Sequence, residues 1–153
     1  PVRHQPAVLP EMMADVALAN RAEDGVGPQF DGIEALRGTQ EPVRQILEVL
    51  RERRDAACEI VNSIPGMNVA VPHSTFYLFP DVTEAMDRMG YTAVGDFAAV
   101  ALHQTGVSFC TREHFGRRQP GEERQYIRLA YSGIEVADIR EGLGRLNEWI
   151  SAA

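Results

Sequence analysis

The feature that most constrains the fold of this sequence is one long amphipathic segment, residues 41–64 (EPVRQILEVLRERRDAACEIVNSI). Its apolar residues recur three and four positions apart, the spacing of one face of an α-helix. Pro42 suits the first turn of such a helix, and Pro65 with Gly66 predicts the turn that follows it. At about 1.5 Å per residue the helix would span roughly 35 Å, which suits a connection between two domains. The apolar positions are Val43, Ile46, Leu47, Leu50, Ala57, Ile60, Val61 and Ile64.

The other predicted elements are short. Helices are expected at residues 11–20, 28–36, 82–89 and 93–104, and strands at residues 68–71, 74–79, 106–109 and 124–131. A last helix is expected from Ser132, which has the spacing of a capping box with Glu135 and precedes a regular apolar stripe. The stripe consists of Val136, Ile139, Leu143, Leu146 and Ile150. This order predicts a small sheet covered by helices, a two-layer α/β unit of the α+β kind.

The composition is that of an ordinary globular domain, and it restricts the partners and the kinds of reaction that the chain could support. The chain has 153 residues and a net charge of −7, which argues against nucleic acid as a partner. No apolar run approaches the length of a membrane span, and the two cysteines suggest a reducing, cytoplasmic setting. The four histidines lack zinc-ligand spacing, so no metal site is expected. All fifteen basic residues are arginine, so chemistry that needs a lysine amine cannot run on this chain alone.

One arginine stands in the middle of an expected strand. In the stretch RQYIRLAYSG, residues 124–133, Arg128 alternates with Ile127 and Leu129, which favour burial. A half-buried guanidinium needs an anion, because an unpaired buried charge is costly. That anion is either an internal carboxylate, such as Glu123 or Asp138, or a bound ligand. A carboxylate ligand would match the planar fork of arginine in two parallel hydrogen bonds.

Three other groups of side chains are weaker candidates. Cys110 and His114 could form a nucleophile and its base, although a cysteine at a strand end is usually inert. The arginines at positions 51, 53 and 54 are expected to form a solvated helix face with their acidic neighbours. The aromatic residues Phe76, Tyr77 and Phe79 are expected in the core more readily than in a pocket.

Three segments in this order resemble one family, the fold-type I pyridoxal-phosphate-dependent aminotransferases of the aspartate aminotransferase class I/II. VLRERRDAACEIVNSIPGM resembles their long interdomain helix, and VPHSTFYLFPDV resembles a strand of their small domain. GVSFCTREHFG, followed by YIRLAYSG and an amphipathic helix, resembles their C-terminal end. GPQFDGIEALRGTQEPVRQIL is similar to the last helices of their large domain. The resemblance covers the chain from about Met12 onward.

The resemblance implies an organisation and a site. Residues 1–40 would be the tail of a large pyridoxal-phosphate-binding domain, and residues 41–153 the small domain with its interdomain helix. Arg128 would bind the α-carboxylate of an amino-acid or 2-oxo-acid substrate, with Phe76 and Tyr77 beside it. The lysine and the other residues that hold pyridoxal phosphate in this family would precede Pro1, so this chain would be a fragment, inactive alone, of a dimeric cytoplasmic enzyme.

The chain also departs from the family pattern. Thr111 and Arg112 stand where the family usually has Pro-Gly, and Ser74 stands where it usually has glycine. These changes alter the loop beside the expected site, where Arg112 could be a second anion contact or a solvated side chain. Two alternatives stay open at this stage. One is a non-catalytic module that binds a carboxylate or a partner chain, and the other is a cysteine-dependent enzyme that uses Cys110 and His114.

Overall fold

A computed structural model describes the backbone of residues 27–153 and the side chains of residues 31–153. The helix expected at residues 11–20 lies outside this range. The chain divides into two compact units, residues 1–44 and residues 45–153. In the first unit, α2 spans Gly27–Arg37, as predicted, and the N–H of Gly38 donates to the carbonyl of Glu34 at its end.

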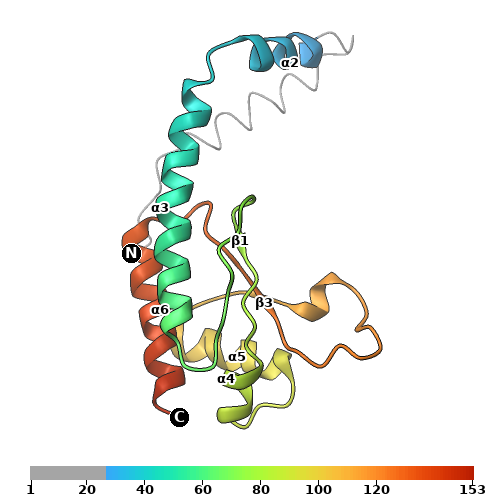
Figure 1. Ribbon diagram of the computed structural model, residues 1–153, viewed down its shortest axis with the longest axis vertical. Helices are drawn as coiled ribbons and strands as arrows, with labels where there is room; N and C mark the ends of the chain where they lie inside the picture. The colour runs from blue at the N-terminus through green and yellow to red at the C-terminus, as the bar shows by residue number, and fades with distance from the viewer. Residues whose placement is uncertain (1–26) are drawn as a thin grey trace. The chain divides into compact units, whose positions relative to one another are not determined.

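The long helix is confirmed as α3, Glu41–Ser63 (Figure 1). Its apolar stripe is used unevenly. The buried residues all lie in the second half of the helix: Ala56, Ala57, Cys58 and Val61. In the first half, Ile46 is 56% exposed and Leu47 is 53% exposed. Half of the amphipathic helix therefore has an apolar face that residues 31–153 do not cover.

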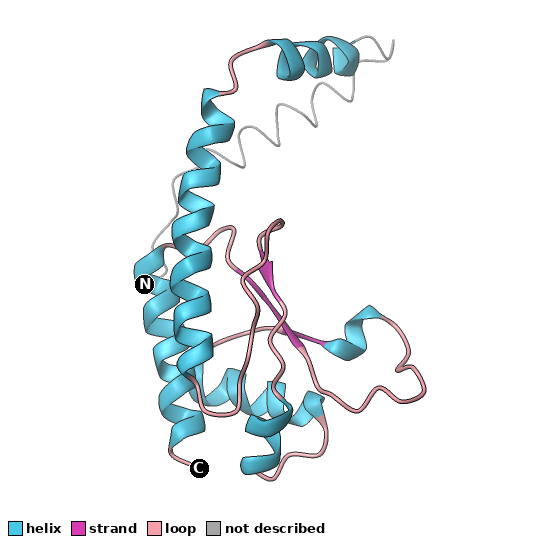
Figure 2. Ribbon diagram, viewed as in Figure 1, coloured by secondary structure: helices cyan, strands magenta, loops and turns pink. Residues whose placement is uncertain are grey.

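The second unit contains a small antiparallel sheet with strand order β1-β3-β2 (Figure 2). The strands are β1, Tyr77–Leu78; β2, Cys110–Thr111; and β3, Ile127–Ala130. Tyr77 pairs with Ala130 on one side of β3, and Cys110 pairs with Arg128 on the other. Ile127 and Leu129 are buried in the core, so side-chain alternation directs Arg128 to the opposite face of the strand.

Helices supply the rest of this unit, which confirms the predicted α+β architecture. They are α4, Thr83–Arg88; α5, Val94–Thr105; the 3-10 helix η1, Arg112–Phe115; and α6, Val136–Ser151. α6 runs beside the second half of α3 (Figure 1). Two ion pairs connect α3 to α6 and to the residue before it. Arg53 pairs with Glu135 at 2.6 Å, and Arg140 pairs with Glu59 at 3.7 Å. No helix within residues 27–153 combines the length and apolarity that crossing a membrane requires.

Two predicted strands are wrong, because local hydrogen bonds occupy their backbones. At residues 68–71 the side-chain amide of Asn62 bonds both the N–H and the carbonyl of Val69, and only an isolated bridge joins Asn68 to Asp81. At residues 106–109 the N–H of Val107 donates to the Thr105 hydroxyl, so pairing begins only at Cys110. The strands expected at 74–79 and 124–131 exist in shortened form as β1 and β3.

The predicted capping box at Ser132 is also wrong. The helix begins at Val136 with Glu135 as its N-cap residue, and no side chain caps it. Arg53 explains the difference, because its guanidinium donates to the carbonyl of Ser132 and to the carboxylate of Glu135. The stripe of α6 nonetheless packs as predicted, with Ile139, Leu143, Leu146 and Ile150 buried.

Candidate functional site

Arg128 is contacted by two aromatic rings. Its guanidinium carbon lies 4.3 Å from the ring centroid of Tyr77 and 4.7 Å from that of Phe115. Tyr77 belongs to β1 and Phe115 ends η1, which follows β2 directly. Because β3 lies between β1 and β2, the rings reach the guanidinium from the two neighbouring strands. We call Tyr77 and Phe115 the aromatic clamp of Arg128.

The half-buried guanidinium has no oxygen acceptor within residues 31–153. Its Nη2 donates to Sγ of Cys110 at 3.6 Å, and no carboxylate of this range forms an ion pair with it. The possibility that Glu123 or Asp138 is the anion that pairs with Arg128 is therefore wrong. Cation–π contacts of this kind contribute about 0.5–2 kcal/mol each without using the N–H donors. The arginine is thus held in place with its hydrogen-bonding capacity largely free for an anion.

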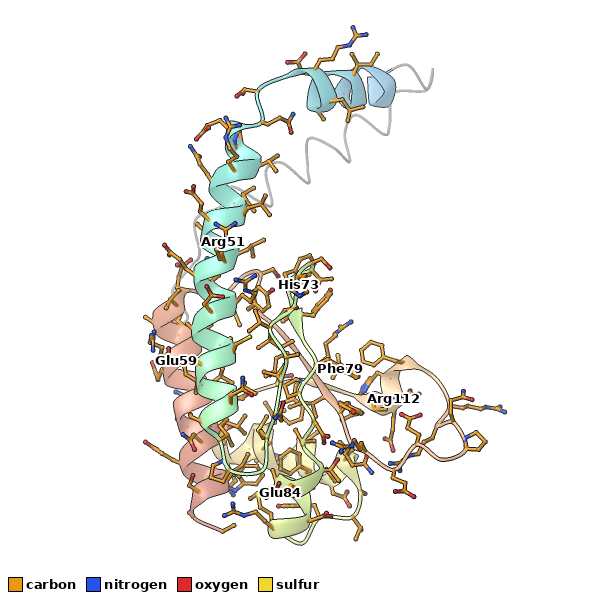
Figure 3. All side chains as sticks on the ribbon, in the orientation of Figure 1. Arg51, Glu59, His73, Phe79, Glu84 and Arg112 are labelled. Atoms are coloured by element: carbon orange, nitrogen blue, oxygen red, sulfur yellow. The ribbon has the colours of Figure 1, made fainter. Side chains whose placement is uncertain are left out.

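Further aromatic contacts hold the clamp. Phe115 meets Phe79 edge-on, with ring centroids 6.3 Å apart and an angle of 75° between the planes. Phe79 in turn stacks on Tyr126 at 5.1 Å and 9°. Figure 3 shows Phe79 beside the sheet, close to the segment that carries Arg112. Phe79 is 44% exposed, so it supports this surface rather than filling the core.

The sequence did not identify Phe115 as a neighbour of Arg128. Phe76, which was expected beside Arg128, contacts the ring of Tyr77 instead of the guanidinium. Phe115 lies within the segment GVSFCTREHFG, but no periodicity marks it, because η1 is a single turn in a polar loop. The ring of Phe76 contacts that of Tyr77 at 4.5 Å and is 39% exposed. Phe76 therefore borders the aromatic clamp through Tyr77.

Arg112 is committed to an internal partner. Its guanidinium pairs with the carboxylate of Glu122, with an Nε–Oε1 distance of 2.5 Å, and both side chains are about four fifths buried. The N–H of Gln119 and the guanidinium of Arg112 lower the pKa of Glu122 below its usual range. Arg118 closes the same loop by donating to the carbonyls of Glu122 and Glu123. Arg112 is therefore neither solvated nor open to a second anion.

Cys110 and His114 do not form a nucleophile–base pair. Nδ1 of His114 bonds the backbone N–H of Thr111 at 3.1 Å and lies 2.9 Å from its hydroxyl. The thiol of Cys110 contacts Arg128, and no contact joins it to His114 within residues 31–153. In the same range, no group of three or more histidine, cysteine or acidic side chains is placed to hold a metal ion.

The prediction that the arginines at positions 51, 53 and 54 form a solvated helix face is wrong for Arg53. Its side chain is only 11% exposed, with bonds to Ser132 and Glu135 and a buried Nε without a partner. Arg54 is 24% exposed and pairs with Asp55 at 2.7 Å. Of the three, Arg51 is the one that lies exposed.

Asp81 anchors the segments beneath the clamp. Its backbone bridges to Asn68 and to Tyr126, and its carboxylate accepts hydrogen bonds from Thr83 and Arg124. Burial alone would raise the pKa of Asp81, but the bonds from Thr83 and Arg124 outweigh burial and hold the pKa below its usual range. Asp81 therefore joins the segment of Tyr126, whose ring stacks on Phe79, to the start of α4.

Comparisons with known proteins point to one class of enzyme, although no family model matches the chain. An asparagine–oxo-acid transaminase of Streptococcus mutans is 31% identical over 80% of the chain, and an aspartate aminotransferase of Bacillus sp. strain YM-2 is 28% identical over 90% of it. The structure of an alanine aminotransferase from Pyrococcus furiosus matches 83% of the chain with a TM-score of 0.72 and 23% identity, covering 30% of that protein. The chain spans 29% and 33% of the two curated relatives, about a third of their length.

Proposed function

From the premise that this chain is a relative of the aminotransferases over four fifths of its length or more, we propose that it is the C-terminal part of a pyridoxal-phosphate-dependent aminotransferase. Residues 41–153 would form the small domain, and residues 1–40 the tail of the large one. The parent reaction transfers an amino group between an amino acid and a 2-oxo acid. The homodimer and the cytoplasmic location implied by the family belong to the same proposal.

Arg128 carries this proposal, because its guanidinium has no internal oxygen partner in the described range and two rings that hold it. A substrate carboxylate can accept two parallel hydrogen bonds from such a fork. This contact fixes the orientation of the bound amino acid, an effect that contributes more to rate than a single hydrogen bond would. Tyr77 and Phe115 position the arginine, and Phe76 borders the clamp.

The cofactor would be held by the rest of the parent. Pyridoxal phosphate, when bound, withdraws electrons from the carbon that bears the amino group. The lysine that anchors it cannot come from this chain, which contains none. We therefore assign to this chain the binding of the carboxylate, and we expect it to be inactive alone.

The exposed apolar face in the first half of α3 supports the proposal that another domain packs against this helix. Val43 and Ile46 are 50% and 56% exposed and lie three positions apart on one helix face. Exposed apolar stripes of this kind mark surfaces that another segment covers. We propose that the large domain of the parent covers this stripe.

The test is Arg128→Gln in the intact parent enzyme, with Arg88→Gln as a matched control on an exposed helical arginine. Loss of two charge-assisted hydrogen bonds predicts a fall of about 10²- to 10⁴-fold in kcat/KM. The absorbance of bound pyridoxal phosphate should not change. An unchanged kcat/KM would remove Arg128 from the site and overturn the proposed role.

The alternative is a non-catalytic module on the same fold that binds a carboxylate or a partner chain. The reading frame that encodes the chain separates the two. A lysine-bearing large domain upstream of Pro1 would support the enzyme. A start codon immediately before Pro1, together with saturable binding of a dicarboxylate that Arg128→Gln abolishes, would support the module.

A further inference from the structure

A separate basic pocket lies between α3 and the loop that leads into β1. It has a volume of about 150 Å³. Its walls include Leu47, Leu50, Arg51 and Arg54 from α3, His73 from the loop, and Tyr131 beneath them. Figure 3 labels Arg51 on its turn of the helix and His73 at the end of the loop.

Both walls of this basic pocket are fixed by the fold. Leu50 and Arg51 follow Leu47 by three and four positions, and Arg54 follows them by four and three, so the four helix residues share one face of α3. The loop is held from below, because Nη1 of Arg54 donates to the carbonyl of Pro72 at 3.4 Å and the hydroxyl of Tyr131 donates to the carbonyl of Thr75 at 2.9 Å. Thr75 has a φ of 69°, the one positive φ of a non-glycine residue in the described backbone. Such a conformation persists only where its surroundings enforce it.

The charge of the basic pocket has one sign. Its lining contains two guanidinium groups and an imidazole, and no carboxylate. Arg54 pairs with the neighbouring Asp55, whose side chain is 56% exposed, while Arg51 has no ion pair or hydrogen bond within residues 31–153. Burial raises the pKa of Tyr131, so its hydroxyl stays neutral and adds no negative charge. This concentration of positive charge stands in a chain whose net charge is −7.

We propose that this pocket binds a small oxyanion, a phosphate or a short carboxylate, through the guanidinium groups of Arg51 and Arg54. The volume of 150 Å³ equals the share of about five water molecules, enough for an ion of this size. Leu47 and Leu50 would contact an apolar substituent of the ligand. The site is distinct from the clamp, because Tyr131 is buried on the core side of β3 whereas Arg128 faces the other side.

The test is a titration of the 153-residue chain, followed by NMR of its backbone amides, with sodium phosphate in one arm and sodium acetate in the other at constant ionic strength. Saturable shifts should appear at residues 50–54 and 72–75. Arg51→Gln should weaken binding by at least about tenfold, the effect of losing a charge-assisted hydrogen bond. Arg88→Gln, the matched exposed arginine, should leave the shifts at residues 50–54 and 72–75 unchanged, and so should Arg128→Gln, which can affect only shifts at the clamp.

The two arms identify the ligand class, since tighter binding of phosphate assigns a phosphate group and tighter binding of acetate assigns a carboxylate. The proposal is overturned if neither ion gives saturable shifts. It is also overturned if Arg88→Gln weakens binding as much as Arg51→Gln, because the binding would then be nonspecific. If Arg128→Gln abolishes the shifts, they arise at the clamp, and the basic pocket is not a site.

Discussion

Arg53 and Arg128 are both partly withdrawn from solvent, and their surroundings differ in kind. Arg53 lies where α3 meets the start of α6, and its side chain is 11% exposed. Two of its nitrogens are satisfied by protein oxygens, the carbonyl of Ser132 and the carboxylate of Glu135. Arg128 lies in β3 among two aromatic rings and a thiol, and no oxygen of residues 31–153 accepts from it.

The difference separates a structural arginine from one that is available to a ligand. Removing a partner from a satisfied buried group leaves an unsatisfied one and costs stability. A guanidinium held by rings gives up no donor to the fold, so its hydrogen bonds remain for a ligand. The same substitution should therefore cost more stability at Arg53 than at Arg128.

After the loss of activity expected of Arg128→Gln, the largest effect should be on stability, in the pair Arg53→Leu and Arg128→Leu. Arg53→Leu leaves the carbonyl of Ser132 without its donor, so we expect the free energy of unfolding to fall by about 1–3 kcal/mol. Arg128→Leu loses two ring contacts of about 0.5–2 kcal/mol each, but it leaves no protein oxygen without its donor and packs an apolar side chain against the same rings, so the net loss should stay below about 1 kcal/mol. Urea denaturation of the chain measures both.

Equal losses in the two variants would contradict this comparison. Arg140→Leu serves as the control, because its pair with Glu59 spans 3.7 Å at the surface and should contribute little.

The next effect concerns the clamp. Phe115→Leu removes one ring from Arg128, so kcat/KM of the parent enzyme should fall by about 2- to 30-fold, the equivalent of about 0.5–2 kcal/mol. The loss should appear mainly in KM, since the arginine is displaced but not removed. Phe115→Tyr keeps a ring and should restore activity. If leucine and tyrosine behave alike, Phe115 does not act through its ring.

The helical part of this fold was predictable from the sequence. The stripes at residues 41–64 and 136–150 identify helices because the period of 3.6 is repeated over several turns. Gly66 was predictable too, and the structure gives the reason. Its φ is 79°, and a Cβ at this position would lie 2.5 Å from the backbone nitrogen of Ala85.

The strands and the clamp were less predictable, because both depend on partners distant in sequence. Asn62 and Thr105 occupy backbone groups that apolar patterning alone assigns to a ladder. Arg128 stood out as a charge among residues that favour burial. Phe115 did not, because its contact with Arg128 arises only when η1 returns to the edge of the sheet.

A smaller effect concerns Asp81, which supports the clamp from below. Asp81→Asn should lower the free energy of unfolding by about 1 kcal/mol at neutral pH, since hydrogen bonds to a charged acceptor are weakened. Because the pKa of Asp81 is lowered in the folded chain, this contribution is present above the unfolded pKa of about 4 and is lost as the pH falls through the folded value.

The measurement is urea denaturation of both proteins between pH 7 and pH 2. The two stabilities should converge as the pH falls below about 4, where protonation removes the charge from Asp81. A difference that is unchanged across this range would show that the carboxylate contributes through shape and not through charge.

The smallest effect is expected of Cys110→Ser. The thiol of Cys110 accepts from Nη2 of Arg128 at 3.6 Å, and sulfur is a weak acceptor, so serine should change kcat/KM of the parent by less than about threefold. The histidine that a thiol nucleophile would require is bonded to Thr111, so alkylation of Cys110 near neutral pH should be slow. Rapid stoichiometric alkylation, together with complete loss of activity in Cys110→Ser, would instead identify the thiol as a nucleophile. The free donors of Arg128 would then orient a substrate for attack by sulfur, and the contrast between the two arginines would acquire a different chemical meaning.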